Sequence, residues 1–322
     1  MVFTNIQILR AIAAVNVVIA HSIYFAISNN FNSSFAFFFK DWGTNGVDIF
    51  FVISGFVIYY IYKKKNRSGF HFILQRMKRI IPLYWFYSLV LFIFFLLFPI
   101  LFNKFSTDFN HLFLSLFFLS GIFFNKLPVY PLGWTLEIEF FYYLIFGLFI
   151  ILIGKKKYFL FLIMLFIILS SWKINSIFIE FLFGILIGTI YFSNNNKLKY
   201  IMSKFSYTIL LTGIISLFLS LFISLNYNRI VLYGIPSFFI VLAAVFLKQN
   251  SNKILIFLGN ASYSIYLTHF LILGIFFKLA KFLIPNFDPT ILFLFSIIIC
   301  LLIGSALYLI IEKRIIKYLR QF

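Results

Sequence analysis

Long uninterrupted apolar runs dominate this sequence, and they restrict the folds that it can adopt. Most of them have the roughly 20 residues that a helix needs to cross a bilayer. The runs are continuous and do not alternate with a period of two, which excludes the strands of an outer-membrane barrel. The pattern therefore predicts an all-α membrane protein. The runs cover residues 5–27, 45–62, 80–101, 111–124, 132–153, 158–171, 174–192, 207–225, 230–247, 254–277 and 290–311.

Composition agrees with a membrane bundle. Hydrophobic residues make up 63% of the 322 residues and charged residues 11%, whereas soluble domains have about 45–50% and about 25%. The longest polar connections, 28–44 and 63–79, are too short to hold a soluble domain. We therefore expect residues 1–322 to form one integral-membrane domain, with no appended soluble domain and with its activity inside the bundle.

The distribution of Lys and Arg predicts the orientation, because cytoplasmic loops carry the excess of these residues. The run 111–124 is too short for a confident span and suits a re-entrant or interfacial segment. If it does not cross and the N-terminus is cytoplasmic, 19 of the 27 Lys and Arg residues lie inside and 7 outside, with Arg10 within the first span. If it does cross, the distribution becomes 12 inside and 14 outside. We therefore predict about ten transmembrane helices with both termini cytoplasmic. This makes the net charge of +19 mainly an orientation signal rather than a sign of nucleic-acid binding.

Two ionisable residues lie within the first span, where such groups are costly and suggest function. Arg10 and His21 are eleven residues apart, which is about 16 Å of helical rise and close to three turns, so both project from one face. Arg10 could instead extend to the cytoplasmic headgroups, and His21 could make only an interhelical hydrogen bond.

Four acidic residues also lie in or beside predicted spans. Asp48, at the start of the second span, could orient a histidine or simply compensate the helix dipole. Glu137 and Glu139 are two residues apart and point in different directions, so only one of them can readily face His21. Glu180 could be a buried partner or a site residue.

Arg76 and Arg79 are spaced i, i+3 and share one helix face, a geometry that suits phosphate binding. A role in topology alone is the alternative. Pro82 follows shortly and suits the beginning of a new helix.

Ser262, Tyr266 and His269 follow an i, i+4, i+7 pattern and form a polar stripe, which suits either helix packing or a substrate wall. No histidine and carboxylate spacing is typical of a metal site, and the single cysteine, Cys300, lies in an apolar run, so we expect no metal.

Taken together, five motifs in this order resemble the acyltransferase-3 family of bacterial integral-membrane acyltransferases. The resemblance extends over essentially the whole chain. Its motifs are Leu9-Arg10-Ala11 with His21, Gly46 to Phe56 around Asp48, Arg76 to Tyr84, Trp134-Thr135-Leu136-Glu137-Ile138-Glu139-Phe140, and Gly259 to His269.

The resemblance implies roles for individual residues. It makes His21 the essential histidine, assigns Arg76 and Arg79 to the family's R-x-x-R motif, and selects Glu139 rather than Glu137. Asp48 is a further catalytic candidate. The expected acyl-CoA site comprises Arg10, Arg76 and Arg79. The candidate substrate-binding residues are Trp134, Ser262, Tyr263 and His269.

The resemblance also implies an activity. Members usually transfer an acyl group, commonly acetyl, from cytoplasmic acetyl-CoA to a sugar hydroxyl at the outer face, as in O-antigen or capsule modification. We expect a multi-pass protein of the bacterial inner membrane, in its stand-alone form, whose partners are a glycan or lipid-linked glycan acceptor, acyl-CoA and membrane lipids, and not nucleic acid. His21 would act as a base or carry the acyl group transiently. The alternative is a transporter or flippase for a glycan or lipid intermediate.

Overall fold

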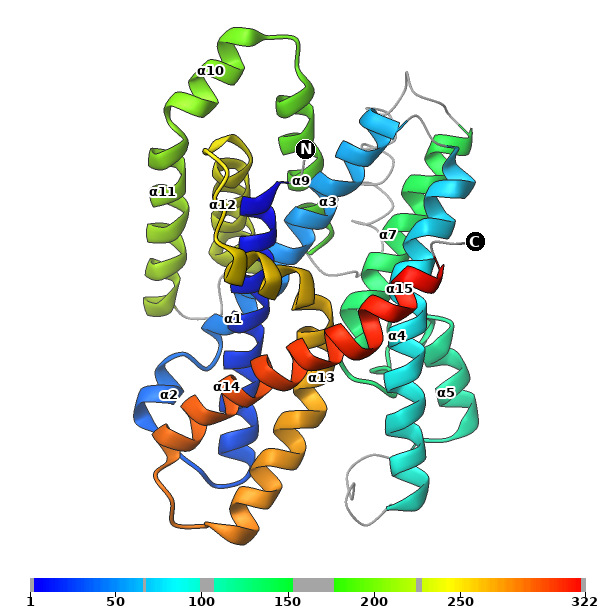
Figure 1. Ribbon diagram of the computed structural model, residues 1–322, viewed down its shortest axis with the longest axis vertical. Helices are drawn as coiled ribbons and strands as arrows, with labels where there is room; N and C mark the ends of the chain where they lie inside the picture. Colours follow the sequence, from blue (N-terminus) through cyan, green and yellow to red (C-terminus); the bar gives the residue numbers. More distant parts are fainter. Residues whose placement is uncertain (1–2, 66–67, 99–106, 153–176, 224–227, 320–322) are drawn as a thin grey trace. The chain divides into compact units, whose positions relative to one another are not determined.

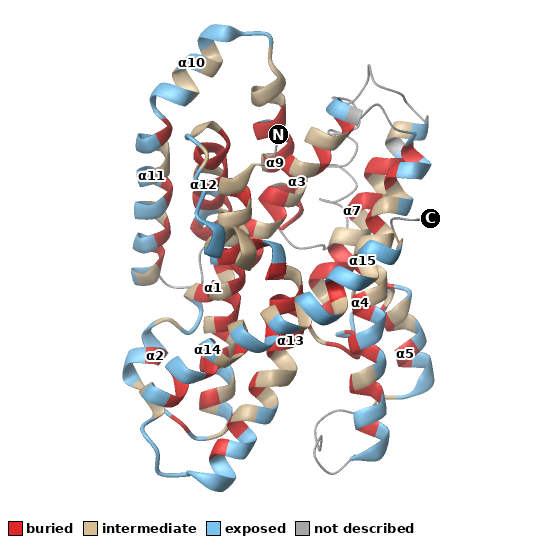
Figure 2. Cartoon of the chain, in the orientation of Figure 1, coloured by how far each residue is buried: buried red, intermediate tan, exposed pale blue. Residues whose placement is uncertain are grey.

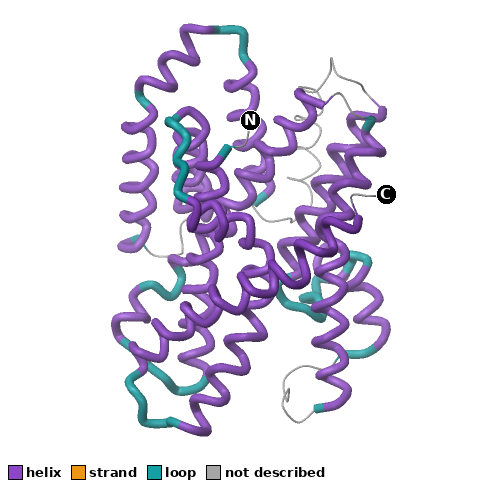
Figure 3. Tube along the Cα trace, viewed as in Figure 1, coloured by secondary structure: helices purple, strands orange, loops and turns teal. Residues whose placement is uncertain are grey.

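The structure is a computed structural model that describes the chain except residues 1–2, 66–67, 99–106, 153–176, 224–227 and 320–322. All regular elements in these described residues are helices, as the sequence predicts (Figures 1 and 3). The chain divides into two compact units, residues 1–65 with 175–310 and residues 66–174 with 311–322. Each unit is described by itself.

Several helices of the described residues are suited to a membrane. Five are long and apolar enough to cross a bilayer, namely Thr4–Ser28, Trp42–Lys64, Gly69–Leu97, Lys253–Leu283 and Pro289–Leu319. A sixth is present if Phe178–Phe192 and Asn196–Lys204, which meet at a bend of 116°, form one span. The apolar helices Ser206–Phe222 and Ile230–Phe246 are shorter. An all-helical architecture with several candidate membrane spans is thus confirmed in the described residues, whereas ten spans and cytoplasmic termini stay predictions. The run 158–171 lies outside the described residues.

The first unit is built around its first helix. Helix α1 packs against α3, α12, α13 and α14, and α3 packs closely against α9. The elements of this unit are α1 (Thr4–Ser28), α2 (Ser34–Phe38), η1 (Trp42–Thr44), α3 (Asn45–Lys65), α9 (Phe178–Phe192), α10 (Asn196–Lys204), α11 (Ser206–Leu219), η3 (Ser220–Phe222), η4 (Ile230–Gly234), α12 (Ile235–Phe246), α13 (Lys253–Leu283) and α14 (Pro289–Leu307).

Small residues allow these helices to approach closely, as is typical inside membranes, where packing rather than hydrophobic burial joins helices. A Cβ atom on Gly259 of α13 would overlap the backbone of Gln7 on α1. Gly55 and Gly184 make the same kind of contact between α3 and α9. Gly46, at the start of α3, lies directly against the Ala13 carbonyl of α1.

The helices of this unit differ in how many of their residues are buried (Figure 2). Twelve residues of α1 are buried, whereas α11 buries only three and α10 none. The polar and ionisable residues of α1 are therefore held inside the unit, where they can meet side chains from neighbouring helices.

The second unit contains α4 (Gly69–Leu97), α5 (Phe109–Leu116), α6 (Ser120–Phe124), α7 (Gly133–Leu152) and α15 (Lys313–Leu319). Helix α4 packs along α7, and α15 lies against α4. Gly69 and Gly147 bring the backbones of α4 and α7 together, because a Cβ on Gly69 would overlap the Gly147 carbonyl.

The segment 111–124 does not form one long helix. Helices α5 and α6 are eight and five residues long, and neither can cross a bilayer. Between them Phe118 has a positive φ of 60°. Its ring stacks between those of Tyr84 and Phe140, at centroid distances of 4.9 and 4.6 Å, which holds this turn in place.

Two expectations about the region after the second span were wrong. The range 63–79 is not a long loop, because α3 continues to Lys65 and α4 begins at Gly69. Pro82 lies inside α4 instead of opening a new helix. A proline inside a membrane helix is tolerated because neighbouring groups can satisfy the carbonyl that it leaves without a partner.

Candidate functional site

A pair of histidines from α1 and α13 forms the centre of the candidate site in the first unit. The imidazole rings of His21 and His269 meet edge to face, with their centroids 4.9 Å apart. His21 is half-buried, and His269 is fully buried. The same two helices, α1 and α13, approach each other closely at Gly259.

The backbone determines which nitrogen each ring presents. His21 Nδ1 lies 3.0 Å from the Val17 carbonyl oxygen, and His269 Nδ1 lies 3.3 Å from the Ile265 carbonyl oxygen. A carbonyl can only accept, so Nδ1 carries the proton in both rings, and in a neutral ring Nε2 then holds the lone pair. His21 therefore presents Nε2 as a potential base.

Further side chains of the predicted polar stripe adjoin this pair. The Tyr266 ring lies 5.8 Å from the His269 ring and 6.2 Å from that of Phe50 on α3, measured between centroids. Ser262 is fully buried on the same helix, and Tyr263 is half-buried. The Nε2 atom of His269 and the hydroxyl of Ser262 have no hydrogen-bond partner within the described part of the chain.

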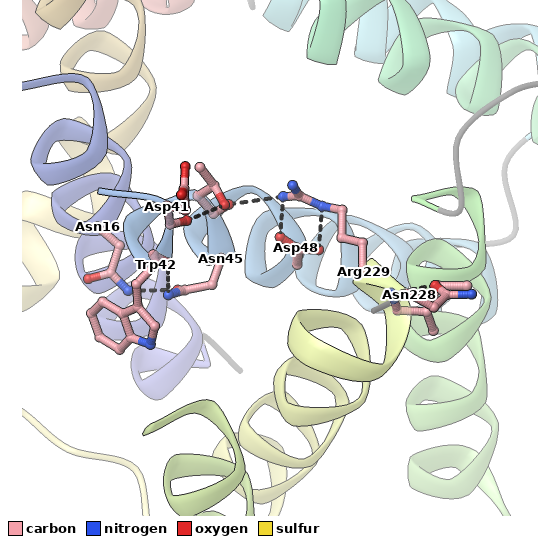
Figure 4. A network of polar contacts seen from close by, with 9 residues as sticks. Asn16, Asp41, Trp42, Asn45, Asp48, Asn228 and Arg229 are labelled. Carbon is pink, nitrogen blue, oxygen red and sulfur yellow. Dashed lines mark hydrogen bonds and ion pairs between the residues drawn. The ribbon is translucent and has the colours of Figure 1, made fainter. Parts of the chain in front are cut away.

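Asp48 forms an ion pair with Arg229 (Figure 4). Arg229 Nε donates to Oδ1 at 3.0 Å, and a terminal nitrogen donates to Oδ2 at 2.6 Å. The same terminal nitrogen donates to the Thr44 carbonyl at 3.2 Å. This bidentate geometry is the strong form of an arginine–carboxylate contact. The ion pair thus supplies a structural role for Asp48, and its catalytic role stays a prediction.

Glu180 of α9 is a buried neighbour of this ion pair. It is fully buried, and the charges of both Asp48 and Arg229 act on it. Neither carboxyl oxygen has a hydrogen-bond partner in the described residues. The start of α3 is also held by Asn16 of α1, whose amide donates to Asn45 Oδ1 at 2.8 Å (Figure 4).

Arg10 lies on the same continuous helix as His21, as the sequence predicts. It is half-buried, and it donates to Gln7 Oε1 at 3.3 Å. This contact is local, and a role in binding acyl-CoA stays a prediction.

In the second unit, Arg76 of α4 lies among aromatic rings. Its guanidinium is 5.8 Å from the centroids of both Phe72 and Tyr143, and the residue is only 8% exposed. Arg76 Nε is buried without a hydrogen-bond partner in the described residues. Arg79, one turn later, is half-buried, and its charge acts on Arg76. Two adjacent cations with an unpaired buried donor are suited to an anionic ligand.

Glu139 belongs to the same cluster through Tyr143. Both residues lie on α7, and the Tyr143 hydroxyl donates to Glu139 Oε1. The carboxyl of Glu139 is half-buried. Trp134, in the first turn of α7, is also half-buried. The R-x-x-R and Trp-Thr-Leu motifs of the sequence therefore meet within this unit.

Glu137 has a different and clearly structural position. Its two carboxylate oxygens accept from the backbone amides of Ser120 and Gly121, at 3.2 and 2.8 Å. A carboxylate at these amides satisfies the first turn of α6. Glu137 and Glu139 thus point to different neighbours, as their spacing predicts.

Arg229 and Tyr143 were not found as site residues from the sequence. Arg229 stands in a short polar connection, where a charge is ordinarily an orientation signal. Tyr143 is one of many aromatic residues in an apolar run. Its position four residues after Glu139 is the only signal in the sequence, because i and i+4 share a helix face.

The comparisons with known proteins agree with these motifs. The sequence profile of the acyltransferase-3 family, described as an acyltransferase domain, matches residues 3–309. The Exopolysaccharide production protein ExoZ of Rhizobium meliloti (strain 1021) is 34% identical over 108 residues, which is 33% of each chain. The aligned part is thus about a third of the length of that relative. No solved structure matches the chain. With a profile that covers nearly its whole length, the chain belongs to the acyltransferase-3 family.

Proposed function

We propose that this protein transfers an acyl group, most simply acetyl, from acyl-CoA to a hydroxyl group of an exported or cell-surface polysaccharide. The single observation that carries the chemical part of this proposal is the geometry of His21. Its Nδ1 is bound to the Val17 carbonyl, which leaves Nε2 as the base. The family supplies acyl transfer as the reaction.

In the proposed reaction His21 Nε2 accepts the proton of the acceptor hydroxyl. The oxygen attacks the thioester carbonyl, the C–S bond breaks, and the thiolate leaves with the proton as free CoA. The products are an ester and a thiol, and no other reactant is needed. In a two-step variant, Nε2 itself attacks the thioester and holds the acyl group until the hydroxyl takes it.

We propose that Arg76 and Arg79 bind the phosphates of acyl-CoA. The unpaired Nε of Arg76 and the neighbouring charge of Arg79 are the observations that support an anionic donor there. Arg10 is proposed as a further contact to the donor. Glu139 and Asp48 are the proposed supporting carboxylates.

The acceptor is proposed from the relative. The name of ExoZ refers to exopolysaccharide production, and sugars of a polysaccharide present many hydroxyl groups. Trp134, Ser262, Tyr263 and His269 are the proposed acceptor contacts. The proposed location is the bacterial inner membrane with both termini cytoplasmic, which agrees with the distribution of Lys and Arg.

The decisive experiment compares His21→Ala with His71→Ala, an exposed histidine of α4 that serves as the control. The polysaccharide of cells that produce each variant is analysed by mass spectrometry, with protein abundance in the membrane measured in parallel. We expect the acyl increment to disappear in His21→Ala and to remain in His71→Ala. Full acylation by His21→Ala would overturn the assignment of the base.

A second experiment separates the two variants of the reaction. The purified protein is mixed with labelled acetyl-CoA without acceptor and quenched rapidly. Label on His21 supports the two-step route, whereas its absence from a preparation that acylates the acceptor once this is added supports direct transfer.

A further inference from the structure

Arg76 and Glu139 have opposite charges within one cluster of the second unit, yet each contacts Tyr143. The charge of Glu139 acts on Arg76. In a poorly hydrated environment such charges attract each other strongly. A direct ion pair would occupy the guanidinium and remove it from ligand binding.

Tyr143 lies where it can prevent a direct ion pair between Arg76 and Glu139. Its ring lies 5.8 Å from the Arg76 guanidinium, and its hydroxyl donates to Glu139 Oε1. Tyr143 is 4% exposed, so water does not compete for that hydroxyl to any large extent. Phe72 lies against both Arg76 and Tyr143, with its ring centroid 6.3 Å from that of Tyr143, and limits their movement.

The contacts of Arg76 indicate that its guanidinium is available to a ligand. Its guanidinium lies against the rings of Phe72 and Tyr143, and Nε has no hydrogen-bond partner in the described residues. A ring face attracts a cation without using its N–H groups. The Nε donor of the guanidinium is therefore not consumed by these ring contacts.

We infer that Tyr143 is a positioning residue that keeps Glu139 from pairing with Arg76 and so leaves Arg76 open to a phosphate-bearing ligand. This inference rests on the proposed function, in which that ligand is acyl-CoA. Tyr143 acts through Arg76 and Glu139 and need not touch the reacting atoms.

The inference predicts the effect of removing the Tyr143 hydroxyl alone. Tyr143→Phe retains the ring beside Arg76 and removes the hydroxyl that donates to Glu139. The carboxylate can then turn to Arg76, on which its charge already acts, and compete with the phosphate. We therefore expect the affinity for CoA to fall roughly tenfold, which corresponds to about 1.4 kcal/mol.

The test measures equilibrium binding of labelled CoA to the full chain in lipid nanodiscs, without reference to activity. We expect Tyr143→Phe to bind more weakly and Tyr143→Phe/Glu139→Gln to regain nearly the wild-type affinity, because glutamine carries no competing charge. Tyr142→Phe, which removes the buried hydroxyl next to Tyr143 on α7, should bind as the wild type does.

Two results would overturn the inference while leaving the proposed donor intact. One is an unchanged affinity in Tyr143→Phe, and the other is a double variant as weak as Tyr143→Phe. If Tyr143→Phe does not fold, Glu139→Gln alone decides. The inference requires that it bind CoA at least as tightly as the wild type, and a loss as large as that of Arg76→Ala contradicts it. Absence of CoA binding by the wild type would instead overturn both the donor and the inference.

Discussion

The rings of His21 and His269 lie edge to face, 4.9 Å apart between centroids, and each ring donates from Nδ1 to a backbone carbonyl of its own helix. In the neutral rings the lone pair of each histidine therefore lies on Nε2. Because His269 is fully buried while His21 is half-buried, His21 is the member that a substrate can reach more readily.

The first prediction concerns His269. We expect His269→Ala to reduce acylation at least tenfold, an order-of-magnitude estimate for a group that contacts the base, because His21 loses the ring that limits its orientation. His269→Gln should retain more activity, since its amide can still bond to a neighbouring carbonyl. The measurement is the rate of acyl transfer in membranes containing equal amounts of each variant. Equal rates in His269→Ala and the wild type would exclude His269 from the site.

The second prediction separates stability from catalysis at Asp48. Asp48→Asn and Arg229→Gln should each lower the thermal unfolding temperature, because each leaves a charge without its partner. In the double variant the losses should be less than additive, with a coupling of roughly 1–3 kcal/mol. The measurement is thermal unfolding in detergent.

Acyl transfer by the same variants decides the catalytic assignment. If Asp48 acts only through the ion pair, the double variant regains activity as it regains stability. A stable but inactive double variant would support direct participation of Asp48 in the reaction.

The third prediction concerns the pH dependence of stability at His111, which lies in α5 outside the candidate spans. Burial lowers the pKa of His111 below its ordinary value of 6.5, and the hydrogen bond from Nε2 to the Leu127 carbonyl opposes part of this shift. The unfolded chain then binds more protons than the folded one near and below pH 6.5, so stability falls as the pH falls.

We therefore expect the unfolding temperature of the wild type to decrease between about pH 7.5 and 5.5, and part of that slope to be absent in His111→Gln. His71→Gln is the control, because His71 is exposed. An identical slope in His111→Gln and the wild type would show that His111 does not contribute.

The fourth prediction concerns topology. A reporter fused after Lys126 should give the signal of the outer side, because α5 and α6 are each too short to cross. A second fusion after Lys155 should report the cytoplasm. A cytoplasmic signal at Lys126 would mean that the region between 98 and 126 adds a span and would invert the predicted orientation of everything that follows.

Much of the helical architecture could be predicted from the sequence. The apolar runs 5–27, 230–247 and 254–277 correspond closely to α1, to η4 with α12, and to α13. This succeeds because a backbone inside a bilayer must satisfy its own hydrogen bonds, so a long apolar run becomes a helix almost regardless of context. Pro82 was misplaced for a related reason, since the rule that proline opens helices is weaker where neighbouring groups can satisfy the backbone.

The sequence by itself determined the class of protein, the helical runs, the shared faces of Arg10 with His21 and of Arg76 with Arg79, and the family. These depend on local periodicity and on motifs that are read along the chain. Only the tertiary structure decided which side chains meet. It pairs His21 with His269, Asp48 with Arg229, and Tyr143 with both Arg76 and Glu139. Such contacts join distant helices or depend on which rotamer the packing allows, and neither is encoded in the spacing of residues along one helix.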